Sequence, residues 1–117
     1  MEIISNYNKV WDSYTSSWSE ANPLKRKLIL EKNLTGDCIY TDPNIQAVGY
    51  EHISDYMEHF QKKFPGASFE TTQYKEHHQQ GLIHWNMKDA KGNIIGTGIS
   101  FCLYSNDERL MKMTGFF

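Results

Sequence analysis

Asp42 is the side chain of this sequence best suited to move a proton. It follows the short apolar stretch 38–41, and Pro43 restricts the backbone directly after it. Aromatic residues make up 14% of the chain, and a carboxylate among such neighbours loses its hydration, which favours its protonated form and suits a general base. The alternative is structural, because Asp-Pro pairs often begin turns in which the carboxylate accepts backbone N–H groups. The sequence leaves both interpretations open.

Three histidines close together in the sequence are the next candidates for chemistry. His77 and His78 end one expected strand, and His84 lies on the following one. If His78 points inward, it forms an acid/base pair with Glu76 or Asp42. Side-chain alternation places His84 on the opposite face of the sheet from His78, so we expect no zinc site. A polar pocket lining with one surface histidine is the simpler alternative.

Length, charge and cysteine content restrict the class of protein. A chain of 117 residues is expected to form a single domain, 1–117. Its net charge of -2 makes nucleic acid and anionic membranes poor partners. We expect Cys38 and Cys102 to be free buried thiols and the protein to be cytoplasmic, since no apolar stretch resembles a signal peptide or a membrane span. The basic run 25–27 lies beside Leu24 and Leu28 and is interpreted as the solvated face of a helix.

Three helices are expected in the first half of the chain. Apolar residues at three- and four-residue spacing predict the first over residues 3–18, with Tyr14 and Trp18 on its buried stripe. The second begins at Asn22-Pro23 and ends near Leu34, where Gly36 is expected to adopt a left-handed conformation. The third covers residues 50–64. Its apolar face consists of Ile53, Tyr56, Met57, Phe60 and Phe64.

Five strands complete the predicted order α-α-β-α-β-β-β-β, which is an α+β arrangement. They cover residues 38–41, 68–78, 82–88, 93–104 and 109–117. A two-residue turn at Lys91-Gly92 would place Trp85 opposite Gly98 and Ile83 opposite Ser100. On this register Trp85 and Met87 share the inner face with Gly96, Cys102, Tyr74, Glu76 and His78.

The order of these segments resembles the nuclear transport factor 2-like superfamily, in its SnoaL-like branch. The resemblance rests on "YTDP", "GYEHISDYMEHFQKKFPG", "HHQQGLIHWNM", "GTGISFCLY" and "RLMKMTGFF", and it covers essentially the whole chain. It implies a cystatin-like cone in which three N-terminal helices pack in a strongly curved antiparallel sheet around a cavity. Relatives include ketosteroid isomerase and polyketide cyclases.

The resemblance assigns roles to three residues. Asp42 matches the general base of proteins similar to ketosteroid isomerase, and Tyr14 matches the tyrosine that binds the oxyanion. Ser100 stands where that enzyme has a protonated carboxylic acid, so this half of the oxyanion site differs. The implied function is a cofactor-independent isomerase, cyclase or dehydratase with catalytic Asp42, Tyr14 and His78. The residues expected to contact a small apolar ligand are Trp18, Tyr40, Met57, Phe60, Trp85, Met87, Ser100, Met113 and Phe117.

The outer face of the predicted sheet implies a second kind of partner. Members of this superfamily commonly dimerise through that face, which here carries Ile99, Phe101 and Leu103. A homodimer is therefore expected. The alternative to an enzyme is a non-catalytic module of the same fold that binds a small ligand or dimerises.

Overall fold

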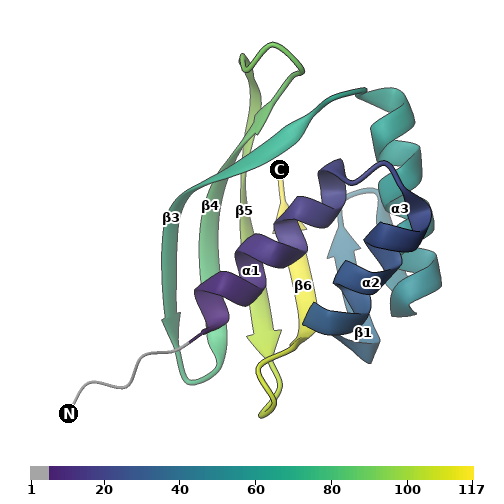
Figure 1. Cartoon of the computed structure of the whole chain (residues 1–117). Coiled ribbons are helices and arrows are strands. Elements are labelled where there is room, and N and C mark those ends of the chain that lie inside the picture. Colours follow the sequence, from purple (N-terminus) through teal and green to yellow (C-terminus); the bar gives the residue numbers. More distant parts are fainter. Residues whose placement is uncertain (1–5) are drawn as a thin grey trace.

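A computed structural model describes residues 6–117 as three α-helices and six strands (Figure 1). Residues 3–5 of the first expected helix lie outside the described residues. The elements in chain order are α1 (Tyr7–Ser16), a 3₁₀ turn (Ser17–Ser19), α2 (Pro23–Asn33), β1 (Leu34–Asp42), β2 (Ile45–Val48), α3 (Gly49–Lys63), β3 (Ser68–His77), β4 (Gln80–Lys88), β5 (Ile94–Tyr104) and β6 (Leu110–Phe116).

The six strands form one sheet in the order β2-β1-β6-β5-β4-β3. Four of the neighbouring pairs are antiparallel, whereas β1 and β6 are parallel, so the expectation of a wholly antiparallel sheet was wrong at this pair. The reason is topological. The chain leaves β1 through β2 and α3, starts again at the far edge with β3, and meanders back until β6 lies beside β1. The predicted α+β class is confirmed, and Figure 1 shows α1 crossing the concave face of the curved sheet.

The end of α2 differs from the sequence prediction. Its start is as expected, because the Asn22 side chain accepts the backbone N–H groups of Leu24 and Lys25 at 2.9 and 3.1 Å. Its last residue is followed at once by Leu34 in an extended conformation, with φ −119°. Gly36 therefore lies within β1 and does not act as a left-handed stop.

One residue of the basic run in α2 is buried, although the sequence predicted that the whole run would face solvent. Arg26 is only 1% exposed, and its guanidinium donates hydrogen bonds to the carbonyls of Glu20, Ala21 and Ser54 and to the Ser54 hydroxyl. Leu24 and Leu28 are 77% and 66% exposed. Arg26 is buried because its donors satisfy carbonyls at the junction of α2 with α3, so the prediction that the whole run is solvated was wrong.

The register of β4 and β5 is the one predicted, although the turn between them is not. Trp85 pairs with Gly98 and Ile83 pairs with Ser100. The connecting loop is longer than two residues, since the Asp89 N–H donates to the Asn93 carbonyl. A register shift between Met87 and Lys88 compensates for the additional residue, which leaves the inner face as expected.

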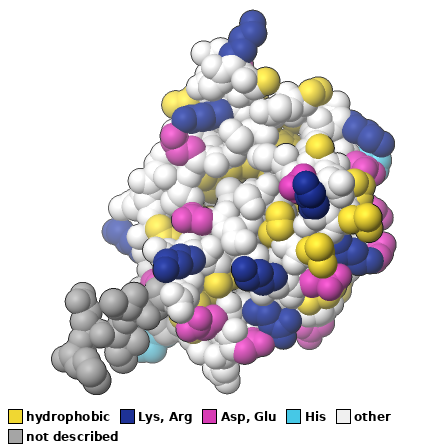
Figure 2. All heavy atoms as spheres, viewed as in Figure 1, with side chains coloured by type: hydrophobic (Ala, Val, Ile, Leu, Met, Phe, Trp, Pro, Cys, Tyr) yellow, Lys and Arg dark blue, Asp and Glu magenta, His cyan; other side chains and the backbone are white. Residues whose placement is uncertain are grey.

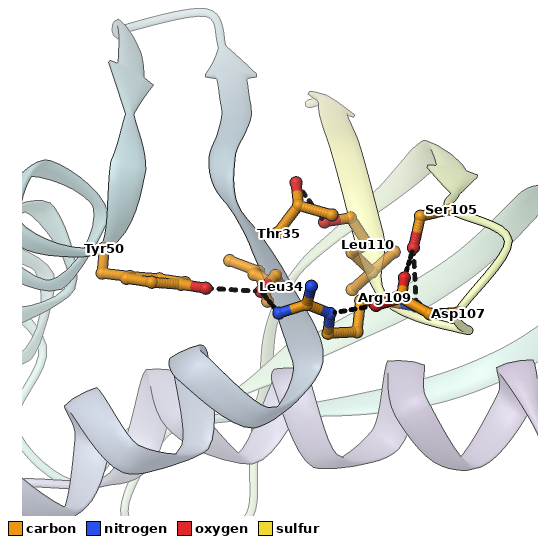
Figure 3. A network of polar contacts seen from close by, with 7 residues as sticks. All are labelled: Leu34, Thr35, Tyr50, Ser105, Asp107, Arg109 and Leu110. Carbon is orange, nitrogen blue, oxygen red and sulfur yellow. Dashed lines mark hydrogen bonds and ion pairs between the residues drawn. The ribbon is translucent and has the colours of Figure 1, made fainter.

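A polar network fixes the start of β1 against the rest of the fold (Figure 3). The Leu34 carbonyl accepts hydrogen bonds from the Tyr50 hydroxyl at 2.8 Å and from the Arg109 guanidinium at 3.4 Å. Arg109 is held in turn by Asp107, which lies 2.8 Å away and also contacts Ser105. This network joins α3 and the β5–β6 turn to the first residue of the strand that ends at Asp42.

Candidate functional site

A cavity of about 560 Å³ lies between the helices and the concave face of the sheet. Its wall includes three of the predicted polar residues, Tyr14, Asp42 and Ser100, but not His78. The wall also includes most of the expected apolar contacts, namely Trp18, Tyr40, Phe60, Trp85, Met87, Met113 and Phe117. Met57 is fully buried and contacts the Ser17 hydroxyl, so it belongs to the packing behind the wall.

The exposed members of the wall mark the mouth of the cavity, namely Asn44, His59, Lys63, Phe64, Ile95, Thr97 and Phe117. The floor is formed by buried residues, namely Tyr14, Trp18, Asp42, Ser100 and Met113. Figure 2 shows hydrophobic side chains inside a hollow of this face, above α1. The cavity is therefore open to solvent through exposed side chains, while its buried wall carries hydroxyls and a carboxylate.

Asp42 occupies the floor at the end of β1 and is 9% exposed. One carboxylate oxygen, Oδ2, accepts the hydroxyls of Tyr40 and Tyr56, each at 2.7 Å. The other, Oδ1, accepts the backbone N–H groups of Asn44 and Ile45 at 2.8 and 3.1 Å. A carboxylate offers about four acceptor positions, so all the positions of Asp42 are occupied.

These four contacts combine both interpretations of Asp42. The two backbone contacts form the local turn expected of an Asp-Pro pair, while the two phenols bring the same carboxylate to the cavity wall. Burial, together with the bond to Asp42, raises the pKa of Tyr56 to about 12 and raises that of Tyr40 further. Both phenols therefore remain protonated and donate to Asp42 at neutral pH.

Tyr14 and Trp18 form a pair on the floor of the cavity, one turn apart in the sequence. The Trp18 indole N–H donates to the Tyr14 hydroxyl at 3.1 Å. Within the described part of the chain, no group accepts the proton of that hydroxyl. Burial raises the pKa of Tyr14, so the phenol is neutral and its proton is available to a ligand.

Ser100 and Trp85 repeat this arrangement on the sheet. The Trp85 indole N–H donates to the Ser100 hydroxyl at 3.0 Å, and Ser100 is 8% exposed. Among residues 6–117, nothing accepts the Ser100 proton either. Trp85 lies directly over Gly98, where a side chain would collide with the indole. Two hydroxyls of the floor thus each receive an indole N–H and retain a free proton.

Sequence reasoning missed several residues of the wall, above all Tyr56. The periodicity of its helix placed Tyr56 on the apolar face, but nothing in the sequence indicated that its hydroxyl would reach Asp42. His59 and Lys63 also line the cavity, whereas the sequence prediction for this helix covered only its apolar residues. Their spacing of three and seven residues from Tyr56 is the signal that could have identified them.

His78 does not share a site with Asp42, so the expectation that it faces the pocket was wrong. The strand β3 ends at His77, and His78 lies exposed in the following turn with φ 51°, where alternation no longer governs its direction. Among the described residues its hydrogen-bond partner is His77, with the two Nδ1 atoms 3.0 Å apart. His84 pairs with Ile99 on the outer face, and residues 6–117 contain no cluster of three side chains suited to a metal ion.

Comparison with solved structures identifies the fold. A SnoaL-like family protein from Agrobacterium tumefaciens, described as a candidate isomerase, matches with TM-score 0.88 and 20% identity over 97% of each chain. A candidate polyketide cyclase from Sinorhizobium meliloti matches with TM-score 0.74 and 11% identity over 96% of this chain and 99% of its own. TerC, co-crystallised with polyporic acid, matches with TM-score 0.75 and 10% identity over 97% and 92%.

These similarities concern the fold, because the identities are low. No protein-family model matches the sequence, and no curated protein matches it either. The chain has the nuclear transport factor 2-like fold in the form found in SnoaL-like proteins, as the order of its segments predicted. No helix within residues 6–117 is long and apolar enough to cross a membrane.

Proposed function

We propose that this protein binds a small, largely apolar molecule in the cavity, with an oxygen atom of that molecule accepting hydrogen bonds from Tyr14 and Ser100. One observation carries the proposal: each hydroxyl accepts an indole N–H and has no recorded acceptor for its own proton among the described residues. A hydroxyl whose oxygen already accepts a hydrogen bond is a stronger donor, because the bonds polarise one another. The floor therefore offers two hydroxyl donors to a carbonyl or hydroxyl group.

The shape of the cavity supports the same function. A volume of about 560 Å³ is typical of sites for small organic molecules, which are mostly apolar with a few placed polar groups. One fold neighbour supports this class of ligand, since TerC was co-crystallised with polyporic acid. The cavity of this chain is walled chiefly by aromatic rings, which favours a flat ligand with aromatic character.

Benzophenone and diphenylmethane test the proposal, because a carbonyl group in the first takes the place of a methylene group in the second. NMR titration would follow the indole N–H signals of Trp11, Trp18 and Trp85, all of which belong to residues of the wall. We expect benzophenone to bind roughly tenfold more tightly than diphenylmethane, which corresponds to about 1.4 kcal/mol from the two hydrogen bonds. Tyr14→Phe and Ser100→Ala should each remove much of this preference.

Tyr50→Phe is the matched control, since the Tyr50 hydroxyl donates to the Leu34 carbonyl and Tyr50 is not part of the wall. It should leave the preference for benzophenone unchanged. Equal binding of the two probes to the unmodified protein would contradict the proposed role of the two hydroxyls. Binding of neither probe would contradict the proposed cavity function altogether.

Acid–base catalysis is a second candidate, favoured by the position of Asp42 on the same floor as the two donors. In such a step the carboxylate takes a proton from the carbon beside a ligand carbonyl. The electrons of the C–H bond move into the carbonyl, and Tyr14 and Ser100 stabilise the resulting enolate oxygen. Because all acceptor positions of Asp42 are occupied, Tyr40 or Tyr56 must first turn away, and Tyr56 is the less buried of the two.

Deuterium uptake distinguishes binding from catalysis. Phenylacetone would be incubated with the protein in heavy water, and exchange of its acidic C–H protons followed by NMR. An isomerase-type enzyme accelerates exchange above the buffer rate, and Asp42→Asn reduces this acceleration by at least about tenfold. Exchange at the buffer rate by the unmodified protein leaves the binding function alone.

The outer face of the sheet supports homodimerisation alongside this function. Ile99 pairs across the sheet with Phe116, and Leu82 pairs with Phe101, so that apolar side chains cover neighbouring strands. Ile99, Leu82 and Phe116 are between 38% and 60% exposed. Sedimentation of the purified protein should give a dimer, and Ile99→Asp should give a monomer that retains its fold.

A further inference from the structure

The charged groups of the cavity wall differ in how far they are exposed to solvent. Of its lining residues only Asp42, His59 and Lys63 carry an acidic or basic side chain. Asp42 belongs to the buried floor, where two phenols and two backbone N–H groups stabilise its negative charge. His59 and Lys63 belong to the exposed mouth. The cavity wall therefore carries a buried carboxylate at Asp42 and an exposed cation at Lys63.

Lys63 has no acidic partner in the part of the chain that the structure describes. The ion pairs there join Lys27 to Glu51, Lys88 to Glu70 and Arg109 to Asp107. The Lys63 ammonium lies instead over the Phe64 ring, 5.6 Å from its centroid. Phe64 is also part of the wall, so this contact holds the cation at the edge of the opening.

The position of Lys63 on α3 is distinct from that of its neighbour Lys62. Both lie in the last turn, where a positive charge stabilises the C-terminal end of a helix. Lys63 is seven residues after Tyr56 and four after His59, so the three share the face that lines the cavity. Lys62 is outside the wall. The helix dipole accounts for both lysines, but only Lys63 also faces the cavity.

We infer that the ligand of this cavity is an aromatic or polycyclic acid, whose apolar body fills the cavity and whose carboxylate or similar anionic group binds Lys63 at the mouth. This inference rests on the proposed binding function and adds the charge and orientation of the ligand. Asp42 repels an anionic group from the floor, while Lys63 attracts it to the opening. The neutral oxygen of the ligand is then left to face Tyr14 and Ser100.

Three matched probes test the charge of the ligand by calorimetry. They are para-benzoylbenzoate, which is anionic, para-benzoylbenzamide, which is neutral, and para-benzoylbenzylamine, which is cationic. We expect the carboxylate to bind the unmodified protein about fivefold more tightly than the amide, the size of a partly exposed ion pair, and the amine to bind least tightly. Lys63→Gln should bring the ratio of carboxylate to amide close to one, whereas Lys62→Gln should leave it unchanged.

The outcomes separate this inference from the function on which it rests. If the amide binds but the carboxylate gains nothing, or if Lys63→Gln leaves the ratio as it was, the anionic ligand is excluded while the binding cavity stands. Tighter binding of the amine would overturn the inference in favour of a cation held by Asp42. If no probe binds, the proposed function fails and the inference with it.

Discussion

Gly98→Ala provides a sharp test of the wall of the cavity. A Cβ atom at this position would lie 2.1 Å from Cζ2 and 2.5 Å from Cη2 of Trp85. Both distances are far below any real contact, and the indole is too rigid to yield by bending. Trp85 must therefore move away, and its hydrogen bond to Ser100 is lost in the process.

Two contributions determine how much Gly98→Ala lowers the free energy of unfolding. Overpacking of a well-packed site costs about 1–3 kcal/mol, and loss of a hydrogen bond costs about 1 kcal/mol more. We expect Gly98→Ala to lower the free energy of unfolding by roughly 2–4 kcal/mol, measured by urea denaturation. The Trp85 indole N–H signal should shift, and the preference for benzophenone over diphenylmethane should fall because Ser100 is no longer oriented.

Gly96→Ala is the matched control on the same strand and the same face. A Cβ atom there would lie 3.9 Å from the Cβ of Met87, which is an ordinary contact. We expect a change within about 0.5 kcal/mol, since the more restricted alanine offsets any small disturbance. If the two variants proved equally stable, the placement of Trp85 over Gly98 would be refuted, and with it the orientation of Ser100.

Three further outcomes follow from buried groups. Arg26→Met should lower the free energy of unfolding, measured by thermal or urea denaturation, by about 2–4 kcal/mol, because it removes the donors from several carbonyls. The control Leu24→Ala, at an exposed position of the same helix, should change it by less than about 0.5 kcal/mol. Burial raises the pKa of Cys38 to about 12 and that of Cys102 to about 11, so a thiol reagent at mildly alkaline pH should label the native protein roughly a hundredfold more slowly than the urea-unfolded chain. Burial and the hydrogen bond to Asp42 raise the pKa of Tyr56 from 10.0 to about 12 in the folded protein. The stabilising contribution of Tyr56 is therefore complete below pH 10.0, the pKa of a tyrosine in the unfolded chain, and is lost as the pH rises to about 12. Urea unfolding at a series of alkaline pH values should show this decline, and Tyr56→Phe should reduce it.

The sequence predicted those parts of the fold that depend on local periodicity. The inner face of β4 and β5 followed from alternation and from the fit of a large ring over a glycine, as in the pair Trp85 and Gly98. The predicted turn was one residue too short, and the register survived because a bulge after Met87 compensates for the difference. Periodicity is robust to such an error when one face of a strand must be buried.

Features that depend on contacts between distant segments were not predictable. The parallel pairing of β1 and β6 depends on where the meander ends relative to β1. The burial of Arg26 depends on carbonyls left free at a helix junction. The partnership of Tyr56 with Asp42 depends on the distance between α3 and the end of β1. A single sequence identifies the residue types in each case but does not indicate which groups they meet.

The candidate site, like the fold, was predictable from the sequence only in part. Asp42, Tyr14 and Ser100 were identified from the resemblance and lie together on the cavity floor. The indole N–H groups that orient two of them, and the saturation of Asp42, emerge only from the three-dimensional contacts. These contacts alter the chemistry expected of the site, since they favour donation of hydrogen bonds to a ligand over direct proton abstraction by Asp42.

The most direct test of the central claim is a crystal structure of the protein soaked with benzophenone. The account predicts that the carbonyl oxygen lies within about 3.5 Å of both the Tyr14 and the Ser100 hydroxyl oxygens, with its rings between Trp18 and Trp85. Benzophenone bound in the cavity with its carbonyl oxygen directed toward the mouth, or a cavity without benzophenone at a saturating concentration, would contradict the account.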